Sequence, residues 1–448
     1  MSKKYKFLIR EALEEIDLDA ISKEYEDPEK IEKRKIIRKI KELLENDFNI
    51  EGNYIINKDS TVSVDGNVEW KSNKPKLSVT FSEVTGKFNC SNSNLESLEG
   101  SPKKVKKFYC KYNKNLTSLE GGPEEVEGYY CNDCNLLSLK GAPKKVKLFD
   151  CKYNKNLTSL EGGPEEVEGY YCNDCNLLSL KGAPKKVKVF NCTRNENLTS
   201  LEGGPEEAEE YRCPECNLLS LEGAPKKVKL FDCIYNKNLT SLEGGPEEVE
   251  GYYCNDCNLL SLKGAPKKVK VFNCTRNENL TSLEGGPEEA EEYRCPECNL
   301  LSLEGAPKKV KYFSCSFNKN LTSLKGGPEE AEKYYCSNCN LLSLRGAPKK
   351  VKFFNFFNNN NLTSLEGGPK EAEEYYCNNC NLLSLKGAPK KVKKFYCSYN
   401  KNLTSLEGGP EEAMYYDCSG CNLLSLKDAP KKVEYLNFTN NPIYDELK

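Results

Sequence analysis

The sequence predicts a repeat solenoid in which every turn contributes one short parallel β-strand and little helix. Three observations predict it. One phrase recurs from residue 84 onward, it alternates between two versions, and marker cysteines recur in steps of 20 or 21 residues, beginning with Cys90, Cys110, Cys131 and Cys151. Phe356 and Phe438 occupy the marker position where cysteine is missing. Repetition at a fixed period of this length is typical of stacked structural repeats. Counting from Cys90 to Phe438 gives 18 turns.

The two versions of the phrase alternate in pairs of 41 residues. Residues 121–139 read Gly-Gly-Pro-Glu-Glu-Val-Glu-Gly-Tyr-Tyr-Cys-Asn-Asp-Cys-Asn-Leu-Leu-Ser-Leu. Residues 141–160 read Gly-Ala-Pro-Lys-Lys-Val-Lys-Leu-Phe-Asp-Cys-Lys-Tyr-Asn-Lys-Asn-Leu-Thr-Ser-Leu. Residues 148–229 and 230–311 differ only at Lys152 versus Ile234, which indicates that the array grew by duplicating blocks of four turns.

The spacing of apolar residues within a turn identifies the type of repeat. The spacing Val126-x-x-Tyr129-x-Cys131-x-x-Cys134-x-Leu136-x-x-Leu139 fits the pattern L-x-x-L-x-L-x-x-[N/C]-x-L. By this pattern the chain resembles leucine-rich repeat proteins, most of all those with short repeats and a Pro-containing outer face. Such repeats occur in bacterial effector proteins and in phage-encoded proteins. The resemblance implies a non-enzymatic scaffold, a phage or bacterial effector, that binds a protein partner on the concave strand face.

The turn template also predicts where the strands lie. Each strand is centred on Tyr129–Cys131 or on Phe149–Cys151, with alternate side chains pointing inward. We therefore expect Tyr130 and Asp150 to face solvent. The return segment contains Gly-Gly-Pro or Gly-Ala-Pro and is too short and too broken for a regular helix.

The segments at the two ends of the chain do not follow the repeat pattern. Residues 4–22 and 28–46 predict two amphipathic helices, and residues 53–80 read as extended, with Asp65-Gly66 as a hairpin-like turn. Because a solenoid exposes apolar end surfaces unless they are covered, we expect caps. The expected organisation is a helical N-terminal cap over 1–50, an extended β transition over 51–83, and a leucine-rich repeat solenoid over 84–448 of about 18 turns that includes a C-terminal cap. Docking of a separate partner is the alternative role for the N-terminal segment.

Charge and composition disfavour several classes of function. The 66 Lys and Arg residues nearly balance 68 Asp and Glu residues, whereas nucleic-acid binders carry a basic surplus. The absence of histidine excludes His-based triads and His metal ligands. No apolar run approaches the roughly 18 residues of a membrane span, and the N-terminus lacks the apolar core of a secretory signal. We therefore expect a cytoplasmic protein that binds neither nucleic acid nor membrane.

The charges alternate from turn to turn. Glu124, Glu125 and Glu127 occupy the places that Lys144, Lys145 and Lys147 occupy one turn later. Stacking is expected to set opposite charges side by side and to disfavour slippage by one turn, which would oppose like charges.

The 24 cysteines include Cys-x-x-Cys pairs such as Cys131/Cys134, a spacing that zinc sites also use. The repeat template offers a different account. Cys131 falls at an inward strand position, and Cys134 falls at the ladder position where Asn154 stands in the next turn. We expect structural cysteines and no metal or other cofactor, with zinc binding and disulfide formation as the alternatives.

Function is expected where the turns vary over an unchanging framework. Variable positions on the strand face carry Tyr and Arg, which are enriched at binding hot spots, although exposed Tyr also simply favours strands. The predicted partner contacts are Tyr130, Tyr153, Tyr171, Arg194, Arg212, Tyr235, Tyr253, Arg276, Arg294, Phe317, Tyr335, Phe357, Tyr376, Tyr396 and Tyr399. The alternative is a structural rod or filament subunit that self-assembles through its ends or its charged faces.

Overall fold

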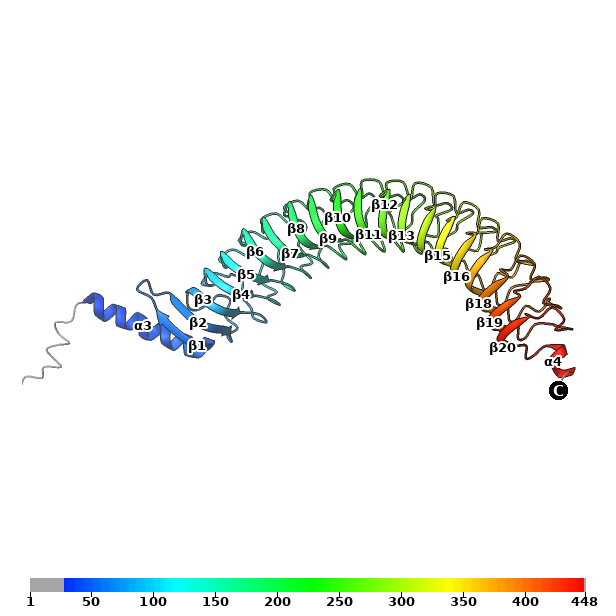
Figure 1. Ribbon diagram of the computed structural model, residues 1–448. Helices are drawn as coiled ribbons and strands as arrows, with labels where there is room; N and C mark the ends of the chain where they lie inside the picture. The colour runs from blue at the N-terminus through cyan, green and yellow to red at the C-terminus, as the bar shows by residue number, and fades with distance from the viewer. Residues whose placement is uncertain (1–27, 447–448) are drawn as a thin grey trace, which may run out of the picture.

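The computed structural model describes residues 28–446, which fold as a leucine-rich repeat solenoid. Figure 1 shows an arc whose strands line the inner, concave side and whose return segments lie on the outer side. Helix α3 (Pro28–Asp47) lies at one end of the arc and α4 (Pro442–Glu446) at the other. The helix expected over residues 4–22 lies outside the described residues, and the helix expected over residues 28–46 is α3.

The strands are short and follow one another in chain order. They are β1 (Phe48–Ile56), β2 (Val62–Trp70), β3 (Phe81–Asn89), β4 (Lys104–Tyr109), β5 (Glu125–Tyr130), β6 (Lys145–Asp150), β7 (Glu166–Tyr171), β8 (Lys186–Asn191), β9 (Glu207–Arg212), β10 (Lys227–Asp232), β11 (Glu248–Tyr253), β12 (Lys268–Asn273), β13 (Glu289–Arg294), β14 (Lys309–Ser314), β15 (Glu330–Tyr335), β16 (Lys350–Asn355), β17 (Glu371–Tyr376), β18 (Lys391–Tyr396), β19 (Glu412–Asp417) and β20 (Lys432–Asn437).

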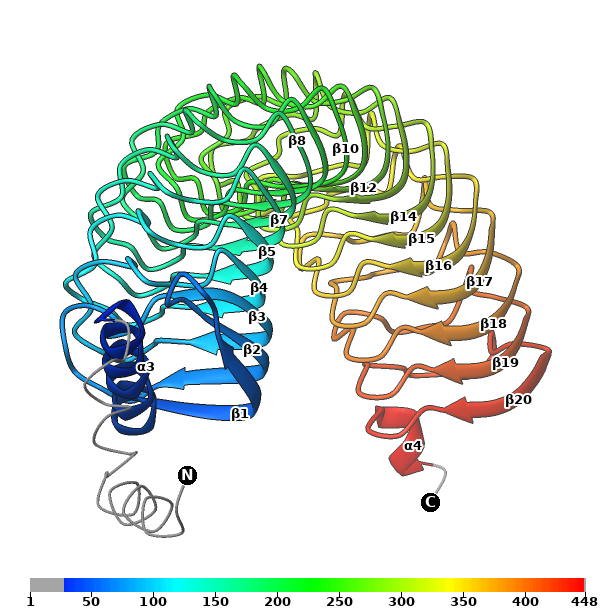
Figure 2. The same ribbon diagram turned by 90° about the vertical axis from the view of Figure 1, so that its left-hand side faces the viewer.

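All these strands belong to one sheet in which each strand pairs with its neighbours in sequence. β1 is antiparallel to β2, and the pairings from β2 to β20 are parallel. The register places Phe149 opposite Tyr129 on one side and Tyr170 on the other. Equivalent residues of successive turns therefore form straight rows along the arc, which Figure 2 shows from the side.

Four buried rows form the core of the solenoid. In a representative turn, the inner aromatic Tyr129, the marker Cys131, and Leu136 and Leu139 are fully buried. The inner rings contact their neighbours in the row, with centroids 5.6 Å apart for Tyr129 and Phe149. Phe356 is equally buried at the marker position, so this position selects an apolar side chain.

The hairpin predicted at Asp65-Gly66 is wrong. The β1–β2 turn covers residues 57–61, where the backbone N–H of Asn57 donates to the carbonyl of Thr61. Gly66 lies in the middle of β2, opposite Gly52 in β1. A Cβ atom at Gly66 would collide with the Glu51 carbonyl oxygen, so this glycine is needed for close approach of two strands and not for a turn.

The predicted pairing of opposite charges between turns is confirmed. Lys145 in β6 pairs with Glu166 in the following strand at 2.7 Å, and Lys147 in β6 pairs with Glu127 in the preceding strand at 3.2 Å. The same two directions recur in later turns, for example Lys227–Glu248 and Lys229–Glu209. Each lysine-bearing strand is thereby linked to both neighbours. Each exposed pair contributes about 0–1 kcal/mol, but a slip by one turn would oppose like charges along the whole array.

Candidate binding surface on the strand face

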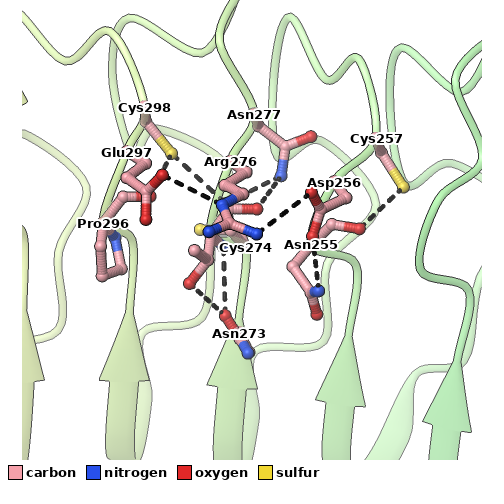
Figure 3. A network of polar contacts seen from close by, with 11 residues as sticks. Asn255, Asp256, Cys257, Asn273, Cys274, Arg276, Asn277, Pro296, Glu297 and Cys298 are labelled. Atoms are coloured by element: carbon pink, nitrogen blue, oxygen red, sulfur yellow. Dashed lines mark hydrogen bonds and ion pairs between the residues drawn. The ribbon is translucent and has the colours of Figure 1, made fainter. Parts of the chain in front are cut away.

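A buried ladder of side chains fixes the bend at which the chain leaves each strand (Figure 3). The side-chain amide of Asn277 donates to the carbonyls of Cys254 at 3.0 Å and Cys274 at 2.8 Å. Its oxygen accepts the backbone N–H of Leu259 at 3.1 Å. One turn later the thiol of Cys298 donates to the carbonyl of Cys274 at 3.3 Å. The ladder of alternating asparagine and cysteine is thus confirmed, and it sets the position of the strand face.

All 24 cysteines are buried free thiols. Burial raises the pKa of Cys134 to about 11 and that of Cys175 to about 12, because an ionised thiol would lose its hydration. Among residues 28–446, no three cysteine or acidic side chains gather in a geometry that could hold a metal ion. The inner cysteines therefore pack in the core, and the ladder cysteines donate hydrogen bonds to backbone carbonyls.

The predicted partner contacts form two rows along the arc and one isolated position. Eight are the last residues of their strands, on the concave face: Tyr130, Tyr171, Arg212, Tyr253, Arg294, Tyr335, Tyr376 and Tyr396. Six lie three residues beyond a strand end, in what we call the rim row: Tyr153, Arg194, Tyr235, Arg276, Phe317 and Tyr399. Phe357 lies two residues beyond the end of β16 and is half-buried. The structure does not gather the fifteen residues into one cluster.

The rim row has an unusual backbone. Its six residues have φ values of 56–63°, the left-handed region that normally favours glycine or asparagine. The bend requires this conformation at each turn, and asparagine supplies the favourable residue at five turns: Asn92, Asn338, Asn358, Asn379 and Asn440. The aromatic rim residues Tyr153, Phe317 and others are nevertheless exposed to solvent. Their side chains are therefore presented outward at a conformational cost of about 1 kcal/mol each.

Most of the predicted arginines are neutralised within the chain. Arg276 Nε lies 3.0 Å from a Glu297 carboxylate oxygen, and its Nη1 lies 3.9 Å from Asp256 (Figure 3). Arg294 pairs with Glu292 on its own strand at 2.7 Å. Arg194 and Arg212 make corresponding pairs with Glu215 and Glu210. These side chains contribute shape and hydrogen-bonding capacity to the face, with little net positive charge.

The expectation that Asp150 faces solvent is wrong. Its side chain is buried because the register sets it between the rings of Tyr130 and Tyr171 on the neighbouring strands. Lys152 Nζ lies 3.3 Å from its carboxylate. Burial raises the pKa of Asp150, and the nearby Lys152 opposes that rise. Tyr130 and Tyr171 are half-buried at the same position, so neighbours on both sides cover much of this row.

The last seven strands carry an unbroken series of stacked rings, whereas on the early strands Tyr109 and Tyr130 stack as a pair with centroids 4.5 Å apart. Seven aromatic rings, one from each strand from β14 to β20, follow one another across the concave face. Successive ring centroids are 4.6–5.1 Å apart. We call this set the aromatic ladder: Tyr312, Tyr335, Phe353, Tyr376, Tyr396, Tyr415 and Tyr435. Six of its rings are half-buried and Tyr435 is exposed.

The sequence reasoning found only three members of the ladder. Tyr335, Tyr376 and Tyr396 are among the predicted contacts because they are tyrosines at variable positions of the strand face. Tyr312, Phe353, Tyr415 and Tyr435 stand two residues earlier, in a position occupied by Gly128 and Leu148 in the early turns. Aromatic residues at this earlier position in four of the last seven turns were the available signal. The missing information was the diagonal contact between the two positions on adjacent strands.

The other part of the strand face is a groove. It extends from β3 to β14 and is lined by the first residues of each strand, alternately two glutamates or two lysines beside a valine or alanine. Opposite charges form ion pairs across its surface, as Glu166 does with Lys145 and Glu127 with Lys147. The groove is therefore electrically balanced, and the aromatic ladder begins where it ends.

The comparisons with known proteins give matches among solved structures. No protein-family model and no curated protein matches the chain. Among solved structures, YopM from Yersinia enterocolitica WA-314 matches with a TM-score of 0.40 and 17% sequence identity, over 84% of this chain and 91% of that chain.

A membrane-spanning helix is not found in residues 28–446, since neither helix there has the length and the apolar character to cross a bilayer.

Proposed function

We propose that this protein is a non-enzymatic interaction scaffold that binds a protein partner on the concave strand face. The observation that carries the proposal is the aromatic ladder, a solvent-facing row of stacked rings on a rigid sheet. Tyrosine offers a large contact area with few rotatable bonds, and stacking against neighbours fixes each ring before binding. A partner therefore meets side chains that have already lost most of their conformational freedom.

The contrast between framework and face supports the proposal. Core positions such as Tyr375 and Leu382 repeat those of the early turns, whereas the position two residues before the strand end is aromatic in β14, β16, β19 and β20 and in none of the strands β4 to β13. The buried positions are enough to fold a turn, because β5 and β6 form with Gly, Leu or Asp on the concave face. A cytoplasmic location and an effector or phage role accompany this proposal as predictions.

Affinity capture with matched variants tests the proposed function. Tyr335→Ala with Tyr396→Ala removes two ladder rings. Tyr171→Ala with Tyr253→Ala removes two tyrosines from the same strand position outside the ladder. We expect a protein captured by the wild type to be lost with the first variant and retained with the second. Equal capture by all three proteins would contradict binding through the ladder.

A structural rod is the second candidate, and the C-terminal end of the sheet favours it. Within the described residues β20 pairs only with β19. Val433, Leu436 and Phe438 are half-buried, whereas Val392, Phe395 and Cys397 two turns earlier are buried. An open strand edge with apolar neighbours is a template for another chain. Light scattering at protein concentrations from 1 to 100 μM tests this candidate. A rod subunit would form polymers that grow with concentration, whereas a scaffold alone would keep a constant monomer mass.

A further inference from the structure

We infer that the aromatic ladder recognises a proline-rich segment in the polyproline II conformation. The inference rests on the proposed function, because it names the kind of protein segment that the strand face takes. Polyproline II helices bind to rows of aromatic side chains in other proteins, since their preformed backbone loses little entropy on binding.

The ladder has the repeat distance of such a segment. Tyr312 and Phe353 occupy the same position on β14 and β16, and Tyr335 and Tyr376 occupy another position on β15 and β17. Over these four strands the ladder repeats every second strand, about 9.6 Å at the usual strand spacing. From β17 to β20 the order changes, because Tyr376 lies directly opposite Tyr396 and Tyr415 lies directly opposite Tyr435. A polyproline II helix repeats every three residues, about 9.3 Å. The six intervals from β14 to β20 span about 29 Å, which ten residues of polyproline II would cover at about 31 Å.

The exposed chemistry of the ladder also fits. Tyr376 and Tyr396 stack with an interplanar angle of 11°, and Tyr415 and Tyr435 with 14°, while the other four contacts of the ladder are tilted by 34–37°. Because the ring faces cover one another, the ladder presents ring edges and hydroxyls to solvent. Nucleobases and sugars need free ring faces for stacking, whereas a proline-rich segment offers pyrrolidine edges and backbone carbonyls.

Hydroxyl donors are free to meet those carbonyls. The hydroxyls of Tyr335, Tyr396 and Tyr415 make no hydrogen bond within the described part of the chain, whereas that of Tyr376 donates to Glu374 at 2.7 Å. A polyproline segment has carbonyl acceptors and no N–H donors, so it complements a row of hydroxyl donors.

The local charge matches a neutral ligand. Lys333 and Lys394 lie beside the ladder, and so do Glu374 and Asp417 on the neighbouring strands. Lys394 is paired with Glu374 at 3.1 Å. A single-stranded nucleic acid would need a basic groove along its phosphates, which this balanced surface does not provide.

Titration of the full chain with a decaproline peptide tests the inference. We expect saturable binding to the wild type by calorimetry, with at least a tenfold loss of affinity in the variant carrying Tyr335→Ala and Tyr396→Ala. The variant carrying Tyr171→Ala and Tyr253→Ala should stay within twofold of the wild type. The pair Tyr335→Phe and Tyr396→Phe keeps the stacked rings, and a severalfold loss there would identify the hydroxyls as donors.

Three outcomes would overturn the inference. These are no heat of binding at millimolar decaproline, equal affinity in the two alanine variants, or equally tight binding of a Gly-Ser peptide of the same length. A soluble glucan that binds the ladder where decaproline does not would also overturn it. If a captured protein depends on the ladder but decaproline does not displace it, the proposed function stands and this inference fails.

Discussion

At the scale of single residues, the buried asparagines are the most informative positions. Asn195 has no solvent exposure, and its amide donates to the carbonyls of Cys172 and Cys192 at 3.0 and 2.7 Å. Its oxygen accepts the backbone N–H of Leu177 at 3.0 Å. One side chain therefore satisfies three backbone groups on two turns. Without it, the Leu177 N–H and the Cys172 carbonyl would stay buried and unsatisfied, while the Cys192 carbonyl would keep the thiol of Cys216 as a donor.

We expect Asn195→Ala to lower the free energy of unfolding by about 3 kcal/mol, since each orphaned buried group costs about 1–3 kcal/mol. Asn197→Ala is the matched control. Asn197 is exposed and its side chain bonds to the half-buried Asn176, so its loss should cost at most about 0.5 kcal/mol. Urea unfolding followed by circular dichroism measures both. Similar small losses in the two variants would contradict the structural role of the ladder.

At the scale of the element, each turn couples its return segment to its inner aromatic residue. Turns with Gly-Gly-Pro carry tyrosine, and turns with Gly-Ala-Pro carry phenylalanine. A Cβ atom at Gly245 would lie 2.7 Å from the Tyr252 hydroxyl, which is buried without a hydrogen-bond partner. In the next turn Ala265 stands in the same place and Phe272 has no hydroxyl. The glycine therefore makes room for the hydroxyl.

A double-mutant cycle tests this coupling. Gly245→Ala alone should destabilise the protein by about 2 kcal/mol through overpacking. Tyr252→Phe alone should be neutral or stabilising by about 1 kcal/mol, because it removes a buried unsatisfied hydroxyl. The double variant recreates the Ala265 and Phe272 turn and should regain wild-type stability. Additive effects, with no rescue in the double variant, would show that the two positions are independent.

The sequence predicted the elements wherever a signal was repeated. The repeat type, the strand of each turn, the inner rows and the charge pairing all rest on patterns that occur many times. The N-terminal segment offered one local signal, Asp65-Gly66, and local turn preference could not reveal that Gly52 lies opposite Gly66. Asp150 was misplaced for a related reason. Its burial comes from rings on two other strands, which no pattern within one turn contains.

At the scale of the whole molecule, the many buried thiols make stability depend on pH. Burial raises the pKa of thiols such as Cys134 and Cys421 to about 11 and Cys175 to about 12, against about 8.5 for an exposed thiol. Since the folded pKa is raised, the folded thiols stay protonated while those of the unfolded chain ionise. Their contribution is complete below about pH 8.5 and is lost as the pH rises toward 11–12.

We therefore expect the urea midpoint, measured with reductant present, to fall steeply between pH 8.5 and 10.5. Within the part of the chain that unfolds together, each buried thiol lowers the free energy of unfolding by up to about 1.4 kcal/mol per pH unit. The chain supplies its own control because it has no histidine, so the midpoint should change little between pH 6 and 8. A midpoint that stays constant up to pH 10.5 would show that the thiols are solvated in the folded state.

The candidate site was less predictable than the fold. The sequence placed Tyr335, Tyr376 and Tyr396 on the strand face, but it treated them as members of a row that extends over the whole solenoid. Only the diagonal stacking of Tyr312 on Tyr335, and its continuation to β20, separates the last seven strands from the rest. That distinction depends on distances between strands, and it narrows the expected contact from the whole strand face to the C-terminal third of the arc.

The measurement that bears most directly on the central claim is hydrogen–deuterium exchange of the chain with and without a captured partner. The account predicts that protection on binding concentrates in β14 to β20, and that the variant carrying Tyr335→Ala and Tyr396→Ala loses it. Protection confined to β3 to β13, or to the ends of the solenoid, would contradict a partner site on the aromatic ladder.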